Sequence, residues 1–405
     1  MSVHASLRPS CRVLLAGLLG LAACSSSPGE DDSSDAGSEG ETSAGETGET
    51  GETSTGETGE TGEPPEPVTL TVIEAVVFYD GYAGIVDEPV PENMIRHSND
   101  LYAIQLDDQT LAAIQNTLEM RVWIGALCDN YDRLGGVFLS LVPKGADSYD
   151  PAAVPRMEIA RFITPFMNMN KQPKAVPYDF DLGAVVPILK DPALVENYDL
   201  WIELQVFGVP YAANTEVPGC ADRNDVFQGA LIFDSNSDSE AVEFDFVTPL
   251  ATREAFNNYQ DGASDAVGTT RKTIAFSLDA DTEQTQLVLI TSNHGANQGG
   301  EEYNRRDHFV YVDGDPVLSY KPGRESCEPF RMFNTQGNGI YGQVPRSDEE
   351  WQSFSNWCPG DVIDTRIIDL GAMAAGAHEF VIDVPDAQFV DGEGDIPLSL
   401  YLQGR

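Results

Sequence analysis

Residues 68–405, called the body below, contain many short runs in which apolar and polar residues alternate. A period of two places successive side chains on opposite faces of a strand, so each run predicts a half-buried β-strand. Clusters of Gly, Pro, Asn and Asp separate the runs and predict turns. Residues 111–118 instead predict one or two turns of helix. The predicted strands are 70–78, 120–124, 136–142, 200–207, 272–278, 286–290, 308–312 and 379–384.

Frequent strands and scarce helices are typical of antiparallel β-sandwiches. The body is longer than a typical single domain, so we expect two domains. A polar Ser/Asp stretch at 234–240 divides it into halves of comparable size, which predicts domains at 68–238 and 239–405. The same stretch has the acidic residues of a calcium loop, but it lacks the Gly and the distal Glu of an EF-hand. We therefore interpret it as a solvated turn.

Residues 1–23 have the parts of a secretory signal. Arg8 and Arg12 give a positive start, and the apolar run at 13–22 is too short to span a bilayer as a helix. The run ends in LAAC, which resembles a lipobox and predicts that Cys24 is the lipidated first residue of the mature protein. An ordinary cleavable signal is the alternative. The preferred interpretation is an exported protein, anchored by lipid to a bacterial membrane or cell surface.

Residues 24–67 repeat the triplet Gly-Glu-Thr and contain no aromatic or basic residue. Low hydrophobicity with charge of one sign predicts a disordered, extended tether. The full chain carries a formal net charge of −43. This charge argues against nucleic acid as a partner, because phosphate binding needs a basic surface.

Four cysteines lie in the body. An even number in an exported protein favours two disulfides. The simplest pairing joins Cys128 to Cys220 in the first half and Cys327 to Cys358 in the second. Since no two of them have CxxC spacing, the sequence does not predict a metal site at these cysteines.

Three stretches of the body carry a resemblance to a known family. The first is CDNYDR at 128–133, followed by IARFITP at 159–165. The second is WIE at 201–203, and the third runs from TSNHG at 291–295 through EEY at 301–303 to WCPG at 357–360. In the same order, the peptide-N-glycosidase F family has CDEWDR, GRFITP, YTE, Gly-His, Ala-Glu-Trp and WCPG. The chain resembles that family over nearly all of the body.

The resemblance implies an all-β fold of two tandem eight-stranded antiparallel jelly-roll sandwiches with a cleft between them, as in the peptidylglycine monooxygenases. It also implies an amidase that releases N-linked glycans and converts the asparagine to aspartate. The implied substrates are N-glycosylated proteins or glycopeptides, with no cofactor and no metal, and we expect a monomer. A copper mono-oxygenase would need closely spaced His ligands, and the body has no His-x-His sequence.

By the same resemblance, three acids are catalytic. Asp132 acts on the water or the reacting amide, Glu302 holds the sugar or the water, and Glu203 assists through a bridging water. Arg133 and Arg161 are candidates to stabilise the carboxylates or a developing oxyanion.

The substrate-binding candidates and their alternatives complete the predicted site. The candidates are Tyr131, Arg133, Arg161, Tyr303 and Trp357. Without the resemblance, three of the predicted site residues also have a structural interpretation. Asp132 beside Arg133 is typical of a surface ion pair, and Trp357 is typical of a buried core residue. The alternation of β-strand side chains allows Glu203 to face solvent. The alternative function is a non-catalytic surface lipoprotein that binds carbohydrate or protein. Retention of all three acids favours the enzyme, whereas Gln205 and Phe354, at a Trp and an Arg of the family, favour the binding protein.

Overall fold

The computed structural model of the protein describes residues 65–257 and 264–405. The predicted signal at 1–23, the lipidation of Cys24 and the tether up to residue 64 lie outside the described residues. Within the described ranges, no helix is long and apolar enough to cross a bilayer. Every strand predicted from the sequence is present, and every strand pair is antiparallel.

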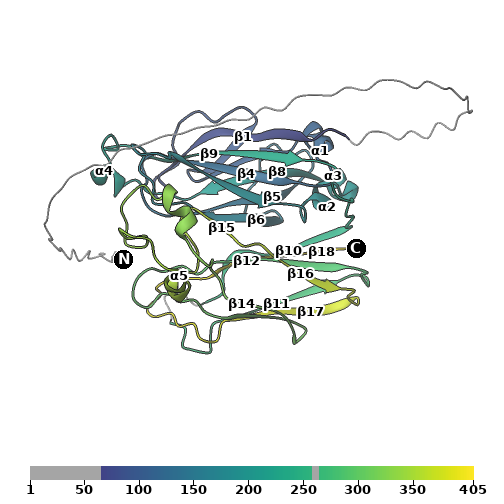
Figure 1. Cartoon of the computed structure of the whole chain (residues 1–405). Helices are drawn as coiled ribbons and strands as arrows, with labels where there is room; N and C mark the ends of the chain where they lie inside the picture. The colour runs from purple at the N-terminus through teal and green to yellow at the C-terminus, as the bar shows by residue number, and fades with distance from the viewer. Residues whose placement is uncertain (1–64, 258–263) are drawn as a thin grey trace, which may run out of the picture. The chain divides into compact units, whose positions relative to one another are not determined.

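The N-terminal half forms a sandwich of two sheets (Figure 1). One sheet has four strands in the order β1 (Val68–Tyr79), β9 (Asp225–Ser235), β4 (Glu119–Ala126) and β7 (Ala175–Asp181). The other has six strands in the order β15 (Val362–Ile363), β6 (Arg156–Ile163), β5 (Leu134–Pro143), β8 (Tyr198–Val206), β3 (Leu101–Gln105) and β2 (Met94–Ser98). The edge strand β15 comes from the C-terminal half, which the sequence did not predict.

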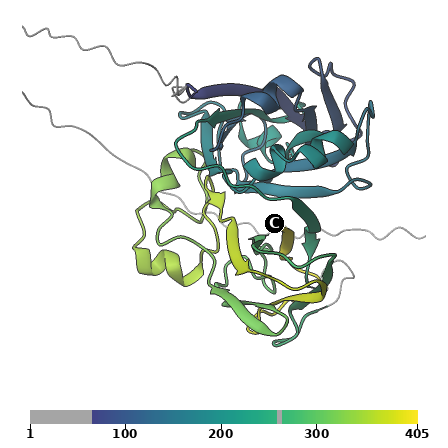
Figure 2. The same ribbon diagram turned by 90° about the vertical axis from the view of Figure 1, so that its right-hand side faces the viewer.

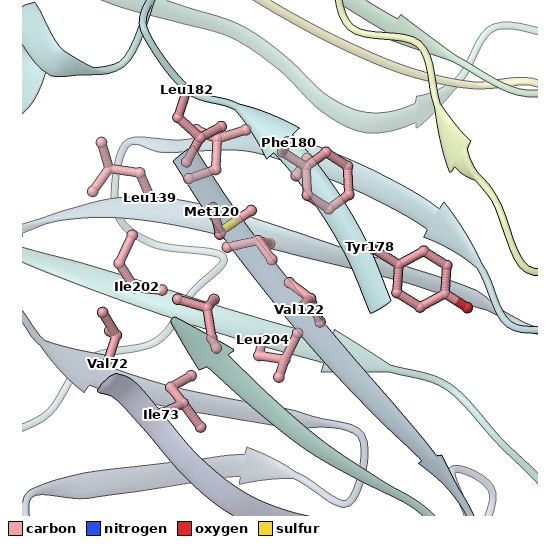
Figure 3. Close-up of a cluster of buried hydrophobic side chains, with 14 of the residues drawn as sticks. Val72, Ile73, Met120, Val122, Leu139, Tyr178, Phe180, Leu182, Ile202 and Leu204 are labelled. Atoms are coloured by element: carbon pink, nitrogen blue, oxygen red, sulfur yellow. The ribbon is translucent and has the colours of Figure 1, made fainter. Parts of the chain in front are cut away.

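Apolar side chains at alternate positions of the strands fill the space between these two sheets. In β4, Met120, Val122 and Ile124 are buried, while the residues between them are exposed or half-buried. Figure 3 shows Met120 and Val122 within one cluster with Ile202 and Leu204 of β8. Burying a side chain of this size contributes about 1.5–3 kcal/mol, so this cluster fixes the register of both sheets.

The C-terminal half forms a second sandwich, whose strands are green to yellow in Figure 2. One sheet has the order β10 (Phe246–Ala255), β18 (Pro397–Gly404), β12 (Thr285–Thr291) and β16 (Arg366–Gly371). The other has the order β11 (Arg271–Leu278), β17 (Gly376–Asp383), β13 (His308–Val312) and β14 (Asp315–Tyr320). Two four-stranded antiparallel sheets of this kind confirm the predicted sandwich. A separate core, which includes Leu289, Phe380 and Leu400, lies between them.

Helices are short and lie in the connections. The helix predicted at 111–118 is α1 (Asp108–Ala113), which begins earlier and ends earlier. Asp107 caps it by accepting from the Thr110 N–H at 2.7 Å, and Ile114 ends it in an extended conformation with its side chain buried. The prediction was wrong for residues 114–118. The other helices are α2 (Val186–Leu189), α3 (Pro192–Asn197), α4 (Ala213–Glu216), the 3-10 helix η2 (Glu328–Phe333) and α5 (Asp348–Phe354).

Both predicted disulfides are confirmed. Cys128 pairs with Cys220 and Cys327 with Cys358, at Cα–Cα distances of 5.5 and 5.3 Å. The two sandwiches touch where β10, β12 and β18 pack against β6. The predicted boundary between residues 238 and 239 falls between β9 and β10 and stays a prediction.

Candidate active site

Two of the predicted acids, Asp132 and Glu302, come together from different sandwiches. Asp132 lies in the connection between β4 and β5, and Glu302 in the connection between β12 and β13. Both are half-buried. Burial raises the pKa of Asp132 and the negative charge of Glu302 raises it further, to about 7, although Arg133 opposes the shift. A carboxyl group with this pKa can accept and return a proton near neutral pH.

Tyr303 completes this cluster. Burial raises its pKa, and the charges of Glu302 and Asp132 raise it further, so the phenol stays protonated and able to donate. Burial also raises the pKa of Glu302, while hydrogen bonds from Tyr303 and from the Gly295 backbone act in the opposite direction. The cluster is therefore two acids of raised pKa beside one phenol donor.

Asp129 shapes the loop that carries Asp132. Its buried carboxylate accepts from the Tyr131 N–H at 2.9 Å, the Val209 N–H at 2.8 Å and the Arg133 Nε at 2.6 Å. Arg133 is thus ion-paired with Asp129, and Asp132 is left without a direct salt bridge to it. This arrangement helps to explain why the pKa of Asp132 stays high.

The loop that carries Glu302 closes on Gly295. The Gly295 N–H donates to Glu302 Oε2 at 3.1 Å, and the Glu302 N–H donates to the Gly295 carbonyl at 3.3 Å. Gly295 has a φ of +110°, and a Cβ there would lie 2.4 Å from the Cα of Gly394. Glycine is therefore required at this position, because any other side chain would displace the loop that presents Glu302.

A cavity of about 470 Å³ adjoins the acid pair. Tyr131 and Tyr303, each next to one of the acids in the chain, are part of its wall, together with Phe166 and Phe354. Aromatic rings with a few polar groups are typical of small-molecule sites. The polar lining residues are Asn130, Glu216, Gln336, Asn338 and Arg346.

Sequence reasoning missed Asn130, Phe166 and Glu216 as cavity residues. The Asn130 Nδ2 donates to Glu216 Oε2 at 2.7 Å, which joins α4 to the loop before β5. One signal could have found this pair, because Asn130 follows Cys128 by two residues and Glu216 precedes Cys220 by four. The predicted disulfide therefore brings them close together.

Glu203 has a different set of partners from the other two acids. It is fully buried in β8 and accepts from Ser140 Oγ at 2.6 Å, Tyr149 Oη at 2.8 Å and Arg156 Nε at 2.6 Å. Neither Asp132 nor Glu302 is among these partners. The alternative that Glu203 faces solvent is wrong, because the outer face of β8 is covered at this point.

Arg161 and Trp357 are buried away from the cavity. The Arg161 guanidinium donates to Glu158 at 2.5 Å, to Ser292 Oγ at 2.9 Å and to the Pro397 carbonyl at 2.8 Å. It therefore joins β6 to the C-terminal sandwich. Trp357 packs against Ile163 and donates from Nε1 to the Asn293 carbonyl at 2.9 Å. Neither residue lines the cavity, and their contact with substrate stays a prediction.

Family models match both halves of the chain. The family models described as the N-terminal and C-terminal parts of peptide-N-glycosidase F match residues 69–221 and 259–403. A search of curated proteins gives no match.

Solved structures show the same fold at low identity. The chain matches PNGF-II with a TM-score of 0.61 and 19% identity, covering 84% of this chain and 65% of PNGF-II. It matches recombinant peptide:N-glycanase F with a TM-score of 0.52 and 16% identity, covering 84% and 95%. It also matches PNGase F, a glycosylasparaginase from Flavobacterium meningosepticum, with a TM-score of 0.52 and 14% identity, covering 84% and 96%.

The fold and the site define a protein of two jelly-roll sandwiches with an acid pair contributed by both. With family models matched in both halves, the chain belongs to the peptide-N-glycosidase F family.

Proposed function

We propose that this protein is an amidase that hydrolyses the glycosylasparagine amide bond of N-glycosylated proteins or glycopeptides. The observation that supports it is the pairing of Asp132 with Glu302, two half-buried acids of raised pKa beside an aromatic-lined cavity. We also propose that the protein is an exported monomer anchored by lipid on Cys24. Two disulfides are typical of exported proteins.

The proposed chemistry needs only protein groups and water. Ionised Asp132 takes a proton from a water held beside Glu302, and the water oxygen attacks the amide carbon. As the carbon–nitrogen bond breaks, Asp132 gives this proton to the departing nitrogen. The products are an aspartate on the polypeptide and a glycosylamine. The hydroxyl of Tyr303 keeps Glu302 oriented throughout.

The cavity offers a binding site for the sugar next to the acid pair. The rings of Tyr131 and Phe166 can stack on the apolar faces of a sugar, and Glu216 and Asn338 offer acceptors and donors to its hydroxyl groups. Phe354 and Tyr303 also line the cavity, with their ring centroids 6.1 Å apart. An aromatic ring at residue 354, where the family has Arg, favours stacking over ionic contact.

The direct test is incubation of the purified protein with an N-glycosylated peptide and a denatured N-glycoprotein, followed by mass spectrometry of the asparagine. We expect release of the glycan and conversion of Asn to Asp. Binding of the glycopeptide without release would contradict the amidase and support the alternative of a non-catalytic carbohydrate-binding protein.

The pH dependence of kcat/KM should reveal the ionisation of Asp132 and its coupling to Glu302. We expect kcat/KM to fall as the pH drops below about 7, because Asp132 then becomes protonated and cannot accept a proton from water. In Glu302→Gln the negative charge that raises the pKa of Asp132 is gone, so the acid limb should move to lower pH. The remaining rate at high pH should also be lower, because the water is held less well.

The pH–rate profile of Glu302→Gln is the measurement. Exposed Glu240→Gln is the control and should leave the acid limb in place. An acid limb of Glu302→Gln that stays at the wild-type pH would contradict the coupling of the two acids.

The role of Glu203 is tested by measuring the effect of one substitution on stability and on catalysis separately. Glu203→Gln keeps acceptors for Ser140 and Tyr149 but loses its charge beside Arg156. We expect a lower thermal midpoint and a larger loss of stability than of kcat/KM, because these contacts hold β8 to β5 and β6. A fall in kcat of roughly a hundredfold at unchanged stability would instead support the catalytic role that the resemblance implies.

A further inference from the structure

We infer that Thr164 and Asn356 are positioning residues that together fix the separation of Asp132 and Glu302. This inference rests on the proposed function, because it concerns the geometry of the same acid pair. Neither residue touches the reacting atoms. Each holds the backbone beside one acid, and the two lie on segments that are hydrogen-bonded to one another.

Thr164 holds the backbone on both sides of Asp132. Its Oγ1 accepts from the Arg133 N–H at 2.8 Å and donates to the Tyr131 carbonyl at 3.3 Å. Its own N–H donates to the Arg133 carbonyl at 2.8 Å. Thr164 is fully buried, so water does not compete for these bonds. The Thr164 hydroxyl therefore fixes the backbone conformation on both sides of Asp132.

Asn356 does the same for the loop of Glu302. Its Nδ2 lies 2.8 Å from the Glu301 carbonyl, 2.5 Å from the Glu302 carbonyl and 3.1 Å from the Asn304 carbonyl. Because three carbonyl oxygens surround it, this atom must be the amide nitrogen. Asn356 is only 5% exposed. The Asn356 side chain thus holds the turn that carries Glu302 in one conformation.

The two positioning segments form one frame. Thr164 continues β6, and Asn356 precedes the WCPG sequence that leads into β15. The Ile163 N–H donates to the Asp361 carbonyl at 3.0 Å, and the Gly360 N–H donates to the Ile163 carbonyl at 2.9 Å. The Cys327–Cys358 disulfide ties the same segment to η2. The sequences RFITP and WCPG would on this basis be the framework that aligns the acids across the two sandwiches.

Thr164→Val and Thr164→Ser separate the hydroxyl from the shape of the side chain. Val matches Thr in size but has no hydroxyl, so the Arg133 N–H loses its partner and the loop is free to shift. A shift of about 1 Å can cost roughly a hundredfold in rate, so we expect kcat to fall tenfold or more with KM little changed. Thr164→Ser keeps the hydroxyl and should recover most of the lost kcat.

Control variants measure how the loss of a hydrogen bond away from the site affects stability and kcat. Thr285→Val removes a buried hydroxyl that lies 2.7 Å from Thr282 Oγ1, far from the site in the fold. It should lower the thermal midpoint without changing kcat. Asn356→Asp removes the three contacts to the Glu302 loop and should lower kcat as well. Asn197→Asp, which removes an exposed amide contact to the Ala193 carbonyl in α3, is the control for the change of amide to carboxylate.

The titration of Asp132 gives a readout that does not depend on activity. In full-length protein labelled with ¹³C at aspartate carboxyl groups, the Asp132 signal is identified by its absence in Asp132→Asn. We expect it to titrate near 7 in the wild type and in Thr164→Ser, and at lower pH in Thr164→Val, where Asp132 moves away from Glu302. If Thr164→Val does not fold, Thr164→Ala takes its place.

The outcomes distinguish the two proposals. A wild-type protein without amidase activity would contradict the proposed function, while the titration would still decide the role of Thr164. If Thr164→Val keeps both the wild-type titration and the wild-type kcat, the positioning inference is overturned and the amidase stands.

Discussion

Asp132→Asn is expected to lower kcat/KM for glycopeptide hydrolysis by roughly a hundredfold to ten-thousandfold, the usual contribution of a general base. The amide keeps the size of the carboxyl group but cannot accept a proton from water. Mass spectrometry of glycan release measures the rate, and exposed Asp87→Asn is the control. A rate within threefold of wild type would remove Asp132 from the mechanism.

The same variant should be more stable than the wild type in alkaline solution. The folded-state pKa of Asp132 is about 7, above the ordinary range of an aspartate, so ionising it in the folded protein is unfavourable. This penalty is full above about pH 7 and disappears when the group is protonated in both states, near or below pH 4. Asp132→Asn should therefore raise the thermal midpoint at about pH 8 and leave it unchanged in acid.

Arg161→Met is expected to destabilise the protein by about 3–5 kcal/mol, because it leaves a buried carboxylate with one partner fewer. Burial alone would raise the pKa of Glu158, but the charges and hydrogen bonds of Arg161 and Arg253 hold it at about 2. Arg161 also donates across to Ser292 and Pro397, so the contact between the sandwiches loses its central donor. Denaturant unfolding measures the loss.

Arg121→Met provides the matched control. Arg121 forms an ion pair with Asp179 on the protein surface, with both side chains largely exposed. Exposed pairs contribute about 0–1 kcal/mol, so the control should change stability little. Equal losses in the two variants would show that the cluster around Glu158 does not hold the sandwiches together.

Much of the fold followed from the sequence because alternation is a local signal. Residues 120–124 alternate in burial in β4 as predicted, and the two disulfides follow from the position of the cysteines in each half. The two residues of β15 could not be predicted, since a pair of apolar residues has no period and its partner lies in the other half. The helix at 111–118 failed because Ile114 gains more by entering the core than by continuing the turn.

The site could be predicted only in part. Asp132 and Glu302 do come together, and Tyr131 and Tyr303 line the cavity beside them, while their catalytic and substrate-binding roles stay predictions. The sequence could not show that Arg161 faces the other sandwich, because an arginine in a strand has the same pattern whether it meets a ligand or a buried carboxylate. Only tertiary contacts reveal the bonds of Thr164, because nothing in the sequence distinguishes its hydroxyl from that of any other threonine.

The pairing of β15 with β6 has a consequence for how the chain is made. Val362 pairs with Phe162 and Ile363 with Arg161, so on the ribosome β6 emerges long before its outer neighbour exists. Until then, β6 has an open edge at Arg161 and Phe162, and open edges recruit other chains. Synthesis of the N-terminal sandwich alone, by truncation or by early termination, should therefore give an aggregation-prone product. Gene fusions and expression fragments of this protein should keep both sandwiches on one polypeptide.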